Sequence, residues 1–387
     1  MDQHKYTLNE LNKNIPVSQK LAFIHQLIKE HAPQIDRISV AVYDPKTDLL
    51  KTFIHSSGDA DPLSNYQSRL SEVASLQEIV RSGDPRIVND LEALYHVSKE
   101  HSSKLNAEGY GSSYTLPMYL NNMFFGFVFF NSYTKDGFLS SLLPTLDVYG
   151  HLISLTVINE LSIIHTMLAA VRTARDMTSL RDVETGAHLD RMAHYARFIA
   201  KTLAPKYGFS DEYIEHLFLF APLHDIGKIG VPDRILHKQG PLDDEELEIM
   251  RQHSRTGRDI IDAMLAEFGL NSLPYVDVLR NITEFHHEKM DASGYPLGLQ
   301  GKDIPIEARI IAVADMFDAL TSRRPYKHAW SNAEAFSLLR TLAGSKLDTD
   351  CIRALTERSA EVEKIQAQFH SDELLPRASG YDETSEF

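Results

Sequence analysis

Cysteine is almost absent from this chain, since Cys351 is the only one among 387 residues. A single thiol cannot form an internal disulfide or a cysteine-based zinc site, so the sequence fits a reducing compartment. The N-terminal half also has no thiol that could attach a bilin-type chromophore. We therefore expect a cytoplasmic protein.

Long apolar runs and a secretory leader are missing as well. The longest apolar stretches, Met123–Phe130 and Leu217–Leu223, are much shorter than the roughly 18 residues that a membrane span requires. The N-terminus, MDQHKYTLNE, is polar and has no apolar segment of the kind found in signal peptides. The sequence thus predicts neither a membrane span nor secretion.

Positive charge is scarce, because 39 Lys and Arg face 54 Asp and Glu and give a formal net charge of −15. Such a surface repels long nucleic acids, whose binding depends mainly on contacts to phosphates. An anionic substrate would need a locally basic pocket. One basic cluster late in the chain offers such a pocket: Arg323, Arg324, Lys327 and His328.

The length of the chain favours two domains, and its composition is that of a globular protein. We expect an α+β domain followed by a long connecting helix and an all-helical domain. The expected boundaries are a flexible N-terminus over residues 1–19, the α+β domain over 20–155, a linker helix over 156–180, the helical domain over 181–370 and a disordered tail over 371–387.

The N-terminal half alternates helical and strand patterns. Turn signals at Asp44-Pro45 and Asn121-Asn122 divide the strand patterns into two hairpins. The expected elements are helices over Leu21–Ile28 and Leu76–Arg81, strands over Ile38–Tyr43, Leu49–His55, Ser113–Tyr119 and Met123–Tyr133, and a long helix from Phe138. This layout resembles a GAF-type sensor domain over roughly residues 15–155; a plain dimerisation domain with an empty pocket is the alternative.

The long helix pattern runs to about Thr178 and carries an apolar stripe with steps of three or four residues. Such a stripe is typical of a coiled-coil seam, so we expect a homodimer through this linker helix. A helix that packs only on its own domain is the alternative. The seam positions are Leu152, Leu155, Ile158, Leu161, His165, Leu168 and Val171. The helix could transmit a change from the sensor domain to the second half.

The second half contains histidines and carboxylates that could converge on metal ions. His224 and Asp225 are adjacent, and Glu184 and His188 share one helix face with Arg191 because they are four residues apart. Alone, each residue is ordinary. Together they form a set, completed by His253, the pair His286–His287 and Asp315, of the ligand types preferred by iron, manganese and zinc.

An adjacent His-Asp pair allows Asp225 to bridge two ions while His224 binds one. Two metals about 3.5–4 Å apart can clamp the attacking and leaving oxygens of a phosphoryl displacement. Lys228 lies about one helical turn after Asp225 and could neutralise charge on a phosphate oxygen in the transition state. The alternative is a surface lysine.

The residues His224–Gly230, followed by Val231-Pro232-Asp233, resemble the signature of the HD superfamily of metal-dependent phosphohydrolases. The run His286-His287-Glu288, then Asp291, then Gly294-Tyr295-Pro296, resembles the HD-GYP subgroup. Further motifs follow in order at Gly298-Leu299, Ile304-Pro305, Ala308-Arg309-Ile310 and Arg324-Pro325-Tyr326-Lys327. The resemblance covers about residues 183–343.

This family hydrolyses the bacterial second messenger cyclic di-GMP, so the resemblance implies the same activity here. It implies Asp225 as the bridging ligand of two iron or manganese ions, and a third ion if Glu184 also binds. The implied metal ligands are His188, His224, Asp225, His253, His286, His287 and Asp315, with Glu184 as the additional one.

The resemblance also implies substrate contacts. Arg324 and Lys327 would hold the phosphates, the former through a bidentate fork and the latter as a point charge, and Lys228 would reach the scissile phosphate. The alternative for Arg324 and Lys327 is that they are exposed basic residues of a turn. Gly294, Tyr295 and Pro296 would form one lip of the pocket, and in the family this loop can also dock signalling proteins.

Two positions depart from the family pattern. Met290 stands where a tryptophan is common, and Ala292 stands where a glycine is common. Neither is an expected ligand, so we expect catalysis to survive, whereas the loop geometry, the fit of guanine and the docking of partners are the properties at risk.

We therefore expect a phosphodiesterase that opens cyclic di-GMP to linear pGpG, with further cleavage to GMP as an option, under regulation by the N-terminal domain. The alternatives are a receptor that binds cyclic di-GMP without hydrolysing it, and a phosphodiesterase for another cyclic dinucleotide such as cyclic GMP–AMP.

Overall fold

In the computed structural model the chain forms two compact units. The N-terminal unit comprises residues 1–174, 210–215 and 272–274, and the helical unit comprises the remainder. The structure describes residues 9–57, 67–94, 108–178, 186–238, 240–271, 273–322 and 329–369.

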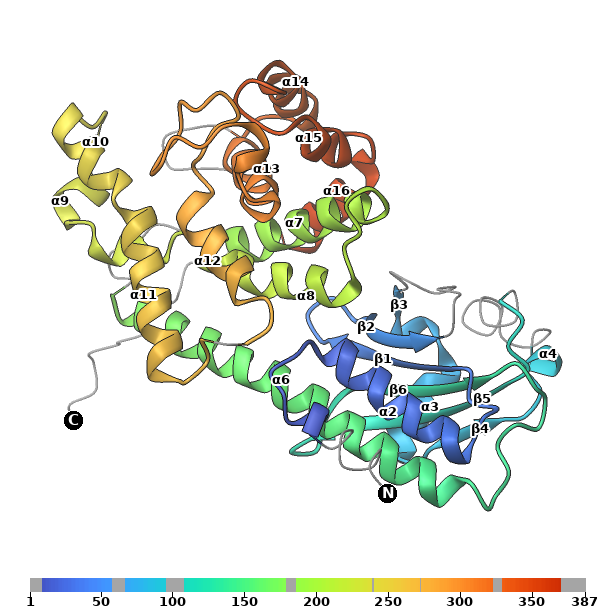
Figure 1. The fold of residues 1–387 in the computed structure, drawn as a ribbon. Coiled ribbons are helices and arrows are strands. Elements are labelled where there is room, and N and C mark those ends of the chain that lie inside the picture. The colour runs from blue at the N-terminus through green and yellow to red at the C-terminus, as the bar shows by residue number, and fades with distance from the viewer. Residues whose placement is uncertain are drawn as a thin grey trace, which may run out of the picture. The chain divides into compact units, whose positions relative to one another are not determined.

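The N-terminal unit is built on one six-stranded antiparallel sheet (Figure 1). The strand order is β3-β2-β1-β6-β5-β4. The strands are β1 (Arg37–Asp44), β2 (Leu49–Ser57), β3 (Gln67–Arg69), β4 (Arg86–Val88), β5 (Ser112–Leu120) and β6 (Met123–Ser132). The two predicted hairpins, β1–β2 and β5–β6, are confirmed and meet where β1 pairs with β6.

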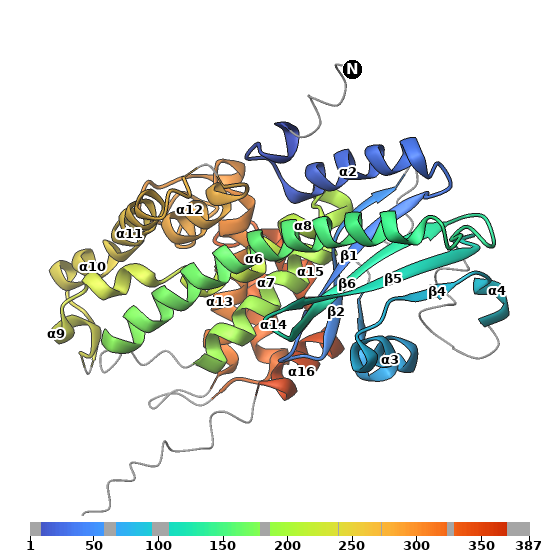
Figure 2. The same cartoon turned by 90° about the horizontal axis from the view of Figure 1, so that it is seen from below.

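Helices cover both faces of this sheet. The helix α3 (Ala74–Ser82) packs with Ala41, Phe127 and Phe129 on one face. The helix α6 (Leu143–Thr178) approaches Leu116 and Phe130 on the other face, which it shares with α2 (Val17–His31) in the view of Figure 2. The short helices η1 (Leu70–Glu72) and α4 (Leu91–Leu94) complete the unit. The predicted α+β architecture is thus confirmed.

The long helix differs from the prediction in its bounds and in its stripe. It begins at Leu143 instead of Phe138 and continues without a break to Thr178, across the boundary between the two units. Leu161 is buried, whereas Leu155 is 53% exposed, so the predicted seam does not lie on one free face. Ile158 and Leu168 are buried as well, Leu152 is exposed, and the side chain of Val171 lies outside the described part.

One segment of α6, Leu143–Ala170, is long and apolar enough to cross a membrane by length and composition. Polar residues are scattered along this segment, so it contains no long uninterrupted apolar run and was not predicted from the sequence to be a candidate span. Half of its most apolar window is buried inside the protein, as in the core helices of many soluble proteins, which meet the same criterion.

The helical unit consists of short helices joined by loops (Figure 1). Its longest elements, α7 (Gly186–Tyr207) and α13 (Ile306–Thr321), pack against each other through residues such as Tyr195 and Phe317, whose ring centroids are 5.1 Å apart. The helix α8 (Asp211–Phe220) begins in the N-terminal unit and belongs to the helical unit from His216 onward. The other elements of the helical unit are η2 (Ala221–Leu223), η3 (Ile226–Gly230), α9 (Asp233–Leu236), α10 (Asp244–Arg251), α11 (His253–Glu267), α12 (Val276–Phe285), η4 (Gly301–Asp303), α14 (Asn332–Leu342), α15 (Thr349–Thr356) and α16 (Ser359–Gln368).

The predicted mostly helical C-terminal half is confirmed. The helix α7 continues through Pro205 to Tyr207, although a proline usually ends or kinks a helix. Leu203 and Ala204 are buried in the last turns, so their packing outweighs the one backbone hydrogen bond that proline removes.

Candidate metal centre

The adjacent His224 and Asp225 lie between the 3-10 helices η2 and η3, directly after α8. A close approach between η3 and α11 fixes their position. A Cβ atom on Gly227 would lie 1.8 Å from the carbonyl oxygen of His253 and 2.4 Å from the nitrogen of Gly257. No side chain fits there, so a glycine is required for α11 to bring His253 up to Asp225.

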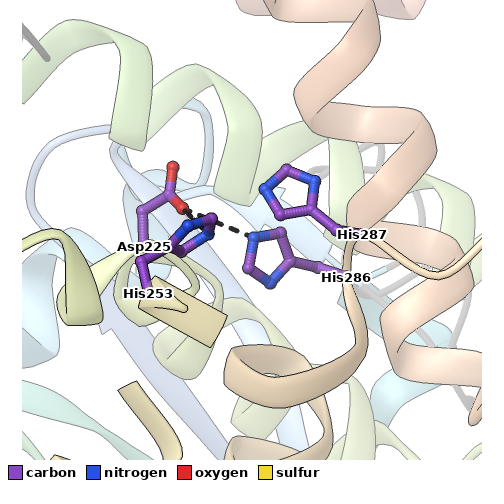
Figure 3. Close-up of side chains that lie close together, drawn as sticks. All are labelled: Asp225, His253, His286 and His287. Carbon is purple, nitrogen blue, oxygen red and sulfur yellow. Dashed lines mark ion pairs between the residues drawn. The ribbon is translucent and has the colours of Figure 1, made fainter. Parts of the chain in front are cut away.

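The structure brings four expected ligands together: Asp225, His253, His286 and His287 (Figure 3). Each offers one ligand atom, and these atoms lie within 4.8 Å of one another. The Oδ1 atom of Asp225 is 3.0 Å from Nε2 of His253 and 3.4 Å from Nε2 of His286. The two histidine neighbours of the carboxylate come from α11 and from the residue after α12, so the group depends on tertiary packing.

The hydrogen bonds of these histidines leave Nε2 facing the carboxylate. The Nδ1 atom of His253 is 2.7 Å from the carbonyl oxygen of Met250, and that of His286 is 2.9 Å from the carbonyl oxygen of Ile282. A neutral imidazole that donates from Nδ1 has a lone pair on Nε2. Within the described residues these Nε2 atoms and Asp225 Oδ1 are buried without a hydrogen-bond partner.

Buried lone pairs that face one another within 3.4 Å repel unless a cation lies among them. Burial lowers the pKa of His286, although Asp225 partly opposes this, and burial lowers the pKa of His287 well below its usual value, with the neighbouring His286 adding to the effect. The neutral imidazoles are therefore favoured, and neutral nitrogens with a carboxylate oxygen are suitable ligands for a divalent transition metal.

A second group of possible ligands comprises His188, His224 and Asp315. The two groups meet at Asp225, whose Oδ2 atom is 3.2 Å from Nε2 of His224. The Nδ1 atom of His224 is 3.1 Å from the carbonyl oxygen of Ala221, so this histidine also directs Nε2 toward the carboxylates. One oxygen of Asp225 thus faces each group.

His188 is oriented by a residue that sequence reasoning missed. Its Nδ1 atom is 2.7 Å from Oδ2 of Asp318, while its Nε2 atom is 3.8 Å from Oδ1 of Asp315. Arg191 donates to both oxygens of Asp318, at 2.7 and 3.1 Å. A carboxylate that holds the far nitrogen of a ligand histidine fixes its tautomer and orientation. The only signal for Asp318 was its position three residues after Asp315 on one helix.

Asp225 is kept ionised despite its burial. Burial favours the protonated form, but the charges of Lys228 and His224 outweigh burial and hold the pKa of this carboxyl well below its usual value. The Nζ atom of Lys228 is 2.7 Å from Oδ2 of Asp225. The lysine therefore lies at the candidate centre, with 21% of its side chain exposed.

The loop after His287 returns to the same place. The ring of Tyr295 lies 4.8 Å from the ring of His287 and 6.2 Å from that of His253. Gly294 precedes it and Pro296 follows it through a cis peptide bond. The three residues expected to form a lip of the pocket therefore lie beside two of the expected ligands.

Three expected site residues, Glu184, Arg324 and Lys327, lie outside the described residues. The predicted tail over residues 371–387 lies outside them as well.

Of the two departures from the family pattern, Ala292 has a φ of +62°, in the left-handed region that favours glycine. The backbone of Met290 bonds to the carbonyl oxygen of Lys346 and to the amide of Gly301, so this residue anchors the loop through its main chain.

Comparison with known proteins finds relatives of the half of the chain that carries this site. Residues 172–351 match the family described as HD domain. Over 196 residues the chain is 41% identical to the cyclic di-GMP phosphodiesterase response regulator RpfG of Xanthomonas campestris pv. campestris. The aligned region covers 51% of this chain and 49% of that protein. A cyclic di-GMP phosphodiesterase of Thermotoga maritima is 38% identical over 49% of this chain and 48% of its own length.

Another relative, 3'3'-cGAMP-specific phosphodiesterase 2 of Vibrio cholerae, is 36% identical over 57% of this chain and 41% of its own length. The chain thus spans about half the length of the curated relatives it matches. Among solved structures, the GAF domain of a phosphoenolpyruvate-protein phosphotransferase from Coxiella burnetii covers 41% of this chain and 92% of its own, with 13% identity and a TM-score of 0.33. Residues 172–351 therefore resemble an HD domain, and the curated relatives that share this half of the chain are named as cyclic dinucleotide phosphodiesterases.

Proposed function

We propose that this protein hydrolyses cyclic di-GMP to linear pGpG, and that cleavage can continue to GMP. The observation that carries the proposal is the convergence of Asp225 with His253 and His286, whose buried acceptor atoms face one another within 3.4 Å. Bound ions would supply Lewis acidity and an activated water for cleavage of a phosphodiester. Two relatives that share this half of the chain carry the name cyclic di-GMP phosphodiesterase.

The proposed ligands of iron or manganese form two groups that share Asp225. Two ions are the basic proposal, and Glu184 would add a third. The ligand set is Glu184, His188, His224, Asp225, His253, His286, His287 and Asp315. The geometry around Asp225 supports its role as a bridge, because one carboxylate oxygen faces each group.

The proposed substrate contacts are cationic. Lys228 would neutralise charge on the scissile phosphate from its position beside Asp225. Arg324 and Lys327 would bind the phosphates of the cyclic dinucleotide, and Gly294, Tyr295 and Pro296 would line one side of the pocket. Local cations are needed because the chain as a whole carries a formal net charge of −15.

The test is the double variant His224→Ala/Asp225→Ala. Turnover of cyclic di-GMP should fall by roughly 1,000-fold or more, because the variant removes two proposed metal ligands and with them the transition-state stabilisation that the ions supply. Each factor of ten in rate corresponds to about 1.36 kcal/mol of that stabilisation. Elemental analysis of anaerobically purified protein should show a matching loss of iron or manganese. Asp262→Ala is the control. Asp262 lies on the face of α11 opposite to His253, and its carboxylate is paired with Arg258 of α11 and Arg280 of α12. A double variant that still cleaves cyclic di-GMP would place the active site elsewhere.

A second candidate substrate is 3'3'-cyclic GMP–AMP. A relative with this specificity matches a slightly longer part of the chain, 229 residues, at 36% identity. A receptor that binds cyclic di-GMP without cleaving it is the third possibility. Incubation of the manganese- or iron-loaded protein with each dinucleotide, followed by chromatography of the products, distinguishes the three.

We also propose a cytoplasmic homodimer in which the N-terminal unit regulates the helical unit. The continuous helix α6 supports a link between the units, and its exposed apolar residues Val148, Leu152 and Leu155 are spaced to form one strip. Leu155→Glu should give monomers by light scattering. Leu161→Glu is unsuitable, because Leu161 is buried and a charge there would destabilise the fold itself.

We further propose that a signalling protein docks at the loop around Tyr295. The domain boundaries at residues 19, 155, 180 and 370 are a separate part of the proposal. The exposed Leu297, 56% accessible at this loop, gives such a partner an apolar contact point.

A further inference from the structure

The loop that carries Tyr295 lies directly on the backbone of the histidine pair. A Cβ atom on Gly294 would lie 2.5 Å from the carbonyl oxygen of His287 and 2.4 Å from the nitrogen of Lys289. The amide of Tyr295 donates to that same carbonyl oxygen at 3.4 Å. The loop and the ligand-bearing segment are therefore in contact at main-chain distance, and a displacement of one moves the other.

Glu288 is the residue that closes this loop. Its side chain comes directly after His287 and is 3% exposed. Its Oε1 atom accepts hydrogen bonds from the amides of Leu297 and Gly298 at 2.7 and 3.0 Å, and Oε2 accepts one from the amide of Leu299 at 3.0 Å. Hydrogen bonds to a carboxylate are among the stronger ones in proteins. Three of them on consecutive amides fix the far end of the loop.

The closed loop sets Tyr295 against the ligands. The ring centroid of His287 is 4.0 Å from that of His286 and 4.8 Å from that of Tyr295. The guanidinium of Arg251 lies over the ring of Tyr295 at 5.6 Å from its centroid. On the neighbouring residue, Nη2 of Arg255 donates to the carbonyl oxygen of Pro296 at 3.2 Å.

We propose that Glu288 is a positioning residue for the metal centre. It holds the loop closed, and the closed loop keeps the ring of Tyr295 against His287 and near His253, which restricts the orientation of both imidazoles. This inference rests on the proposed function, because it requires that these histidines bind a metal. It assigns a role to a glutamate that neither binds metal nor touches substrate.

The test compares Glu288→Gln with the wild type and with Glu284→Gln. Glutamine keeps the size of the side chain but replaces one acceptor oxygen with an NH₂ group, so the three amide bonds cannot all be kept. Glu284 lies four residues earlier and pairs with Arg258 without touching the loop, so it is the matched control. Each protein is stripped of metal and titrated with Co²⁺, whose visible absorption reports the geometry of its ligands.

We expect Glu288→Gln to bind Co²⁺ about 10-fold more weakly with an altered visible spectrum, because loss of the groups that orient ligands typically weakens metal binding by 10–100-fold. Amide hydrogen exchange at Leu297, Gly298 and Leu299 should become faster in the same variant. Glu284→Gln should match the wild type in both measurements. Unchanged exchange, or faster exchange with wild-type Co²⁺ affinity and spectrum, would overturn the inference.

A second pair of variants decides the question if Glu288→Gln does not fold. Tyr295→Phe keeps the aromatic ring and should leave the Co²⁺ affinity and spectrum as in the wild type, whereas Tyr295→Ala should reproduce the weaker binding. Equal Co²⁺ binding by these two variants would contradict the inference. Failure of the wild type to bind Co²⁺ at all would instead contradict the proposed function.

Discussion

Asp225 and Asp318 in the helical unit and Glu160 in the N-terminal unit are buried carboxyl groups whose pKa values are shifted in opposite directions. In the helical unit, burial favours protonation of Asp225 and Asp318, but the charge of Lys228 beside Asp225 and the hydrogen bonds from His188 and Arg191 to Asp318 help to outweigh burial and lower both pKa values. In the N-terminal unit, burial raises the pKa of Glu160 to about 7, the charge of Glu212 adds to this, and Lys20 opposes it only in part. The two aspartates are therefore kept ionised, whereas Glu160 is about half protonated near pH 7.

The difference separates groups that can hold a cation from groups that only pack. An ionised carboxylate in the interior retains a charge that a metal can use, whereas a protonated one does not. Histidines repeat the pattern. In the N-terminal unit both ring nitrogens of His25 are bonded, to Ser56 at 2.8 Å and to the carbonyl oxygen of Ile35 at 2.9 Å. His286 instead directs one nitrogen at a carboxylate.

The largest effect among the variants that test this comparison is expected for Asp318→Asn. Loss of its charge weakens the hold on His188, so the affinity of the group formed by His188, His224 and Asp315 for Mn²⁺ should fall by about 10–100-fold. The group around His253 and His286 should keep its affinity. Titration of metal-free protein, followed by electron paramagnetic resonance or calorimetry, separates the two classes of site.

Asp262→Asn is the control for this variant. Asp262 also accepts hydrogen bonds from two arginines, Arg258 at 2.6 Å and Arg280 at 2.7 Å, and no histidine ligand is among these partners. Its loss should leave both affinities for Mn²⁺ unchanged. Equal weakening of both classes by Asp318→Asn would show that the two ligand groups do not behave as distinct sites.

The next effect concerns stability and pH in the N-terminal unit. The pKa of Glu160 is about 7 in the folded protein and near 4.5 when unfolded, so the folded state binds more protons between these values and stability falls as pH rises through this window. Above pH 7 the loss is complete. Glu160→Gln removes this dependence and should raise the free energy of unfolding at pH 8 by roughly 2–3 kcal/mol.

At pH 4.5 or below, Glu160→Gln should have nearly the same stability as the parent, because Glu160 is then protonated in the folded state and at least half protonated in the unfolded state. Urea unfolding at pH 4.5, 6, 7 and 8 measures the difference. A constant gap between variant and parent across this range would mean that Glu160 does not titrate near neutrality.

The smallest effect is expected for Ala292→Gly in the helical unit, a variant that changes backbone strain and leaves the charge unchanged. Ala292 has a φ of +62°, and Ala292→Gly should raise the free energy of unfolding by about 0.5–1 kcal/mol, because glycine adopts this conformation without a steric penalty. Ala343→Gly is the matched control, since Ala343 has a φ of −61° and glycine there should destabilise the protein. Thermal unfolding compares the two, and a destabilising Ala292→Gly would contradict the assignment of strain.

Local patterns in the sequence were sufficient for most elements and for the adjacent ligands. The hairpins followed from alternation and from the turn at Asn121-Asn122, both of which have positive φ. The strands β3 and β4 were missed because each has three residues, too few to show a period. The stripe on α6 predicted a helix correctly but gave no means to tell which face other segments would cover.

Residues that act through the ligands were harder to predict. Asp318 forms its bonds with His188 across 130 positions of sequence, so no short motif connects the two. Glu288 was visible as a letter of the family motif, but its three bonds to the amides of Leu297, Gly298 and Leu299 exist only once the loop has closed. Ligands can be read from their chemistry, whereas the groups that orient them follow from the tertiary structure.

The contact between Gly227 and Gly257 limits how this protein can evolve. A methyl group on Gly227 would lie inside the main chain of α11, and a Cβ atom on Gly257 would lie 3.3 Å from the nitrogen of Gly227. Any larger residue at Gly227 would therefore push η3 away from α11 and separate Asp225 from His253. We expect this pair of glycines to be retained in any descendant of the protein that keeps the site, even where the surrounding loops change.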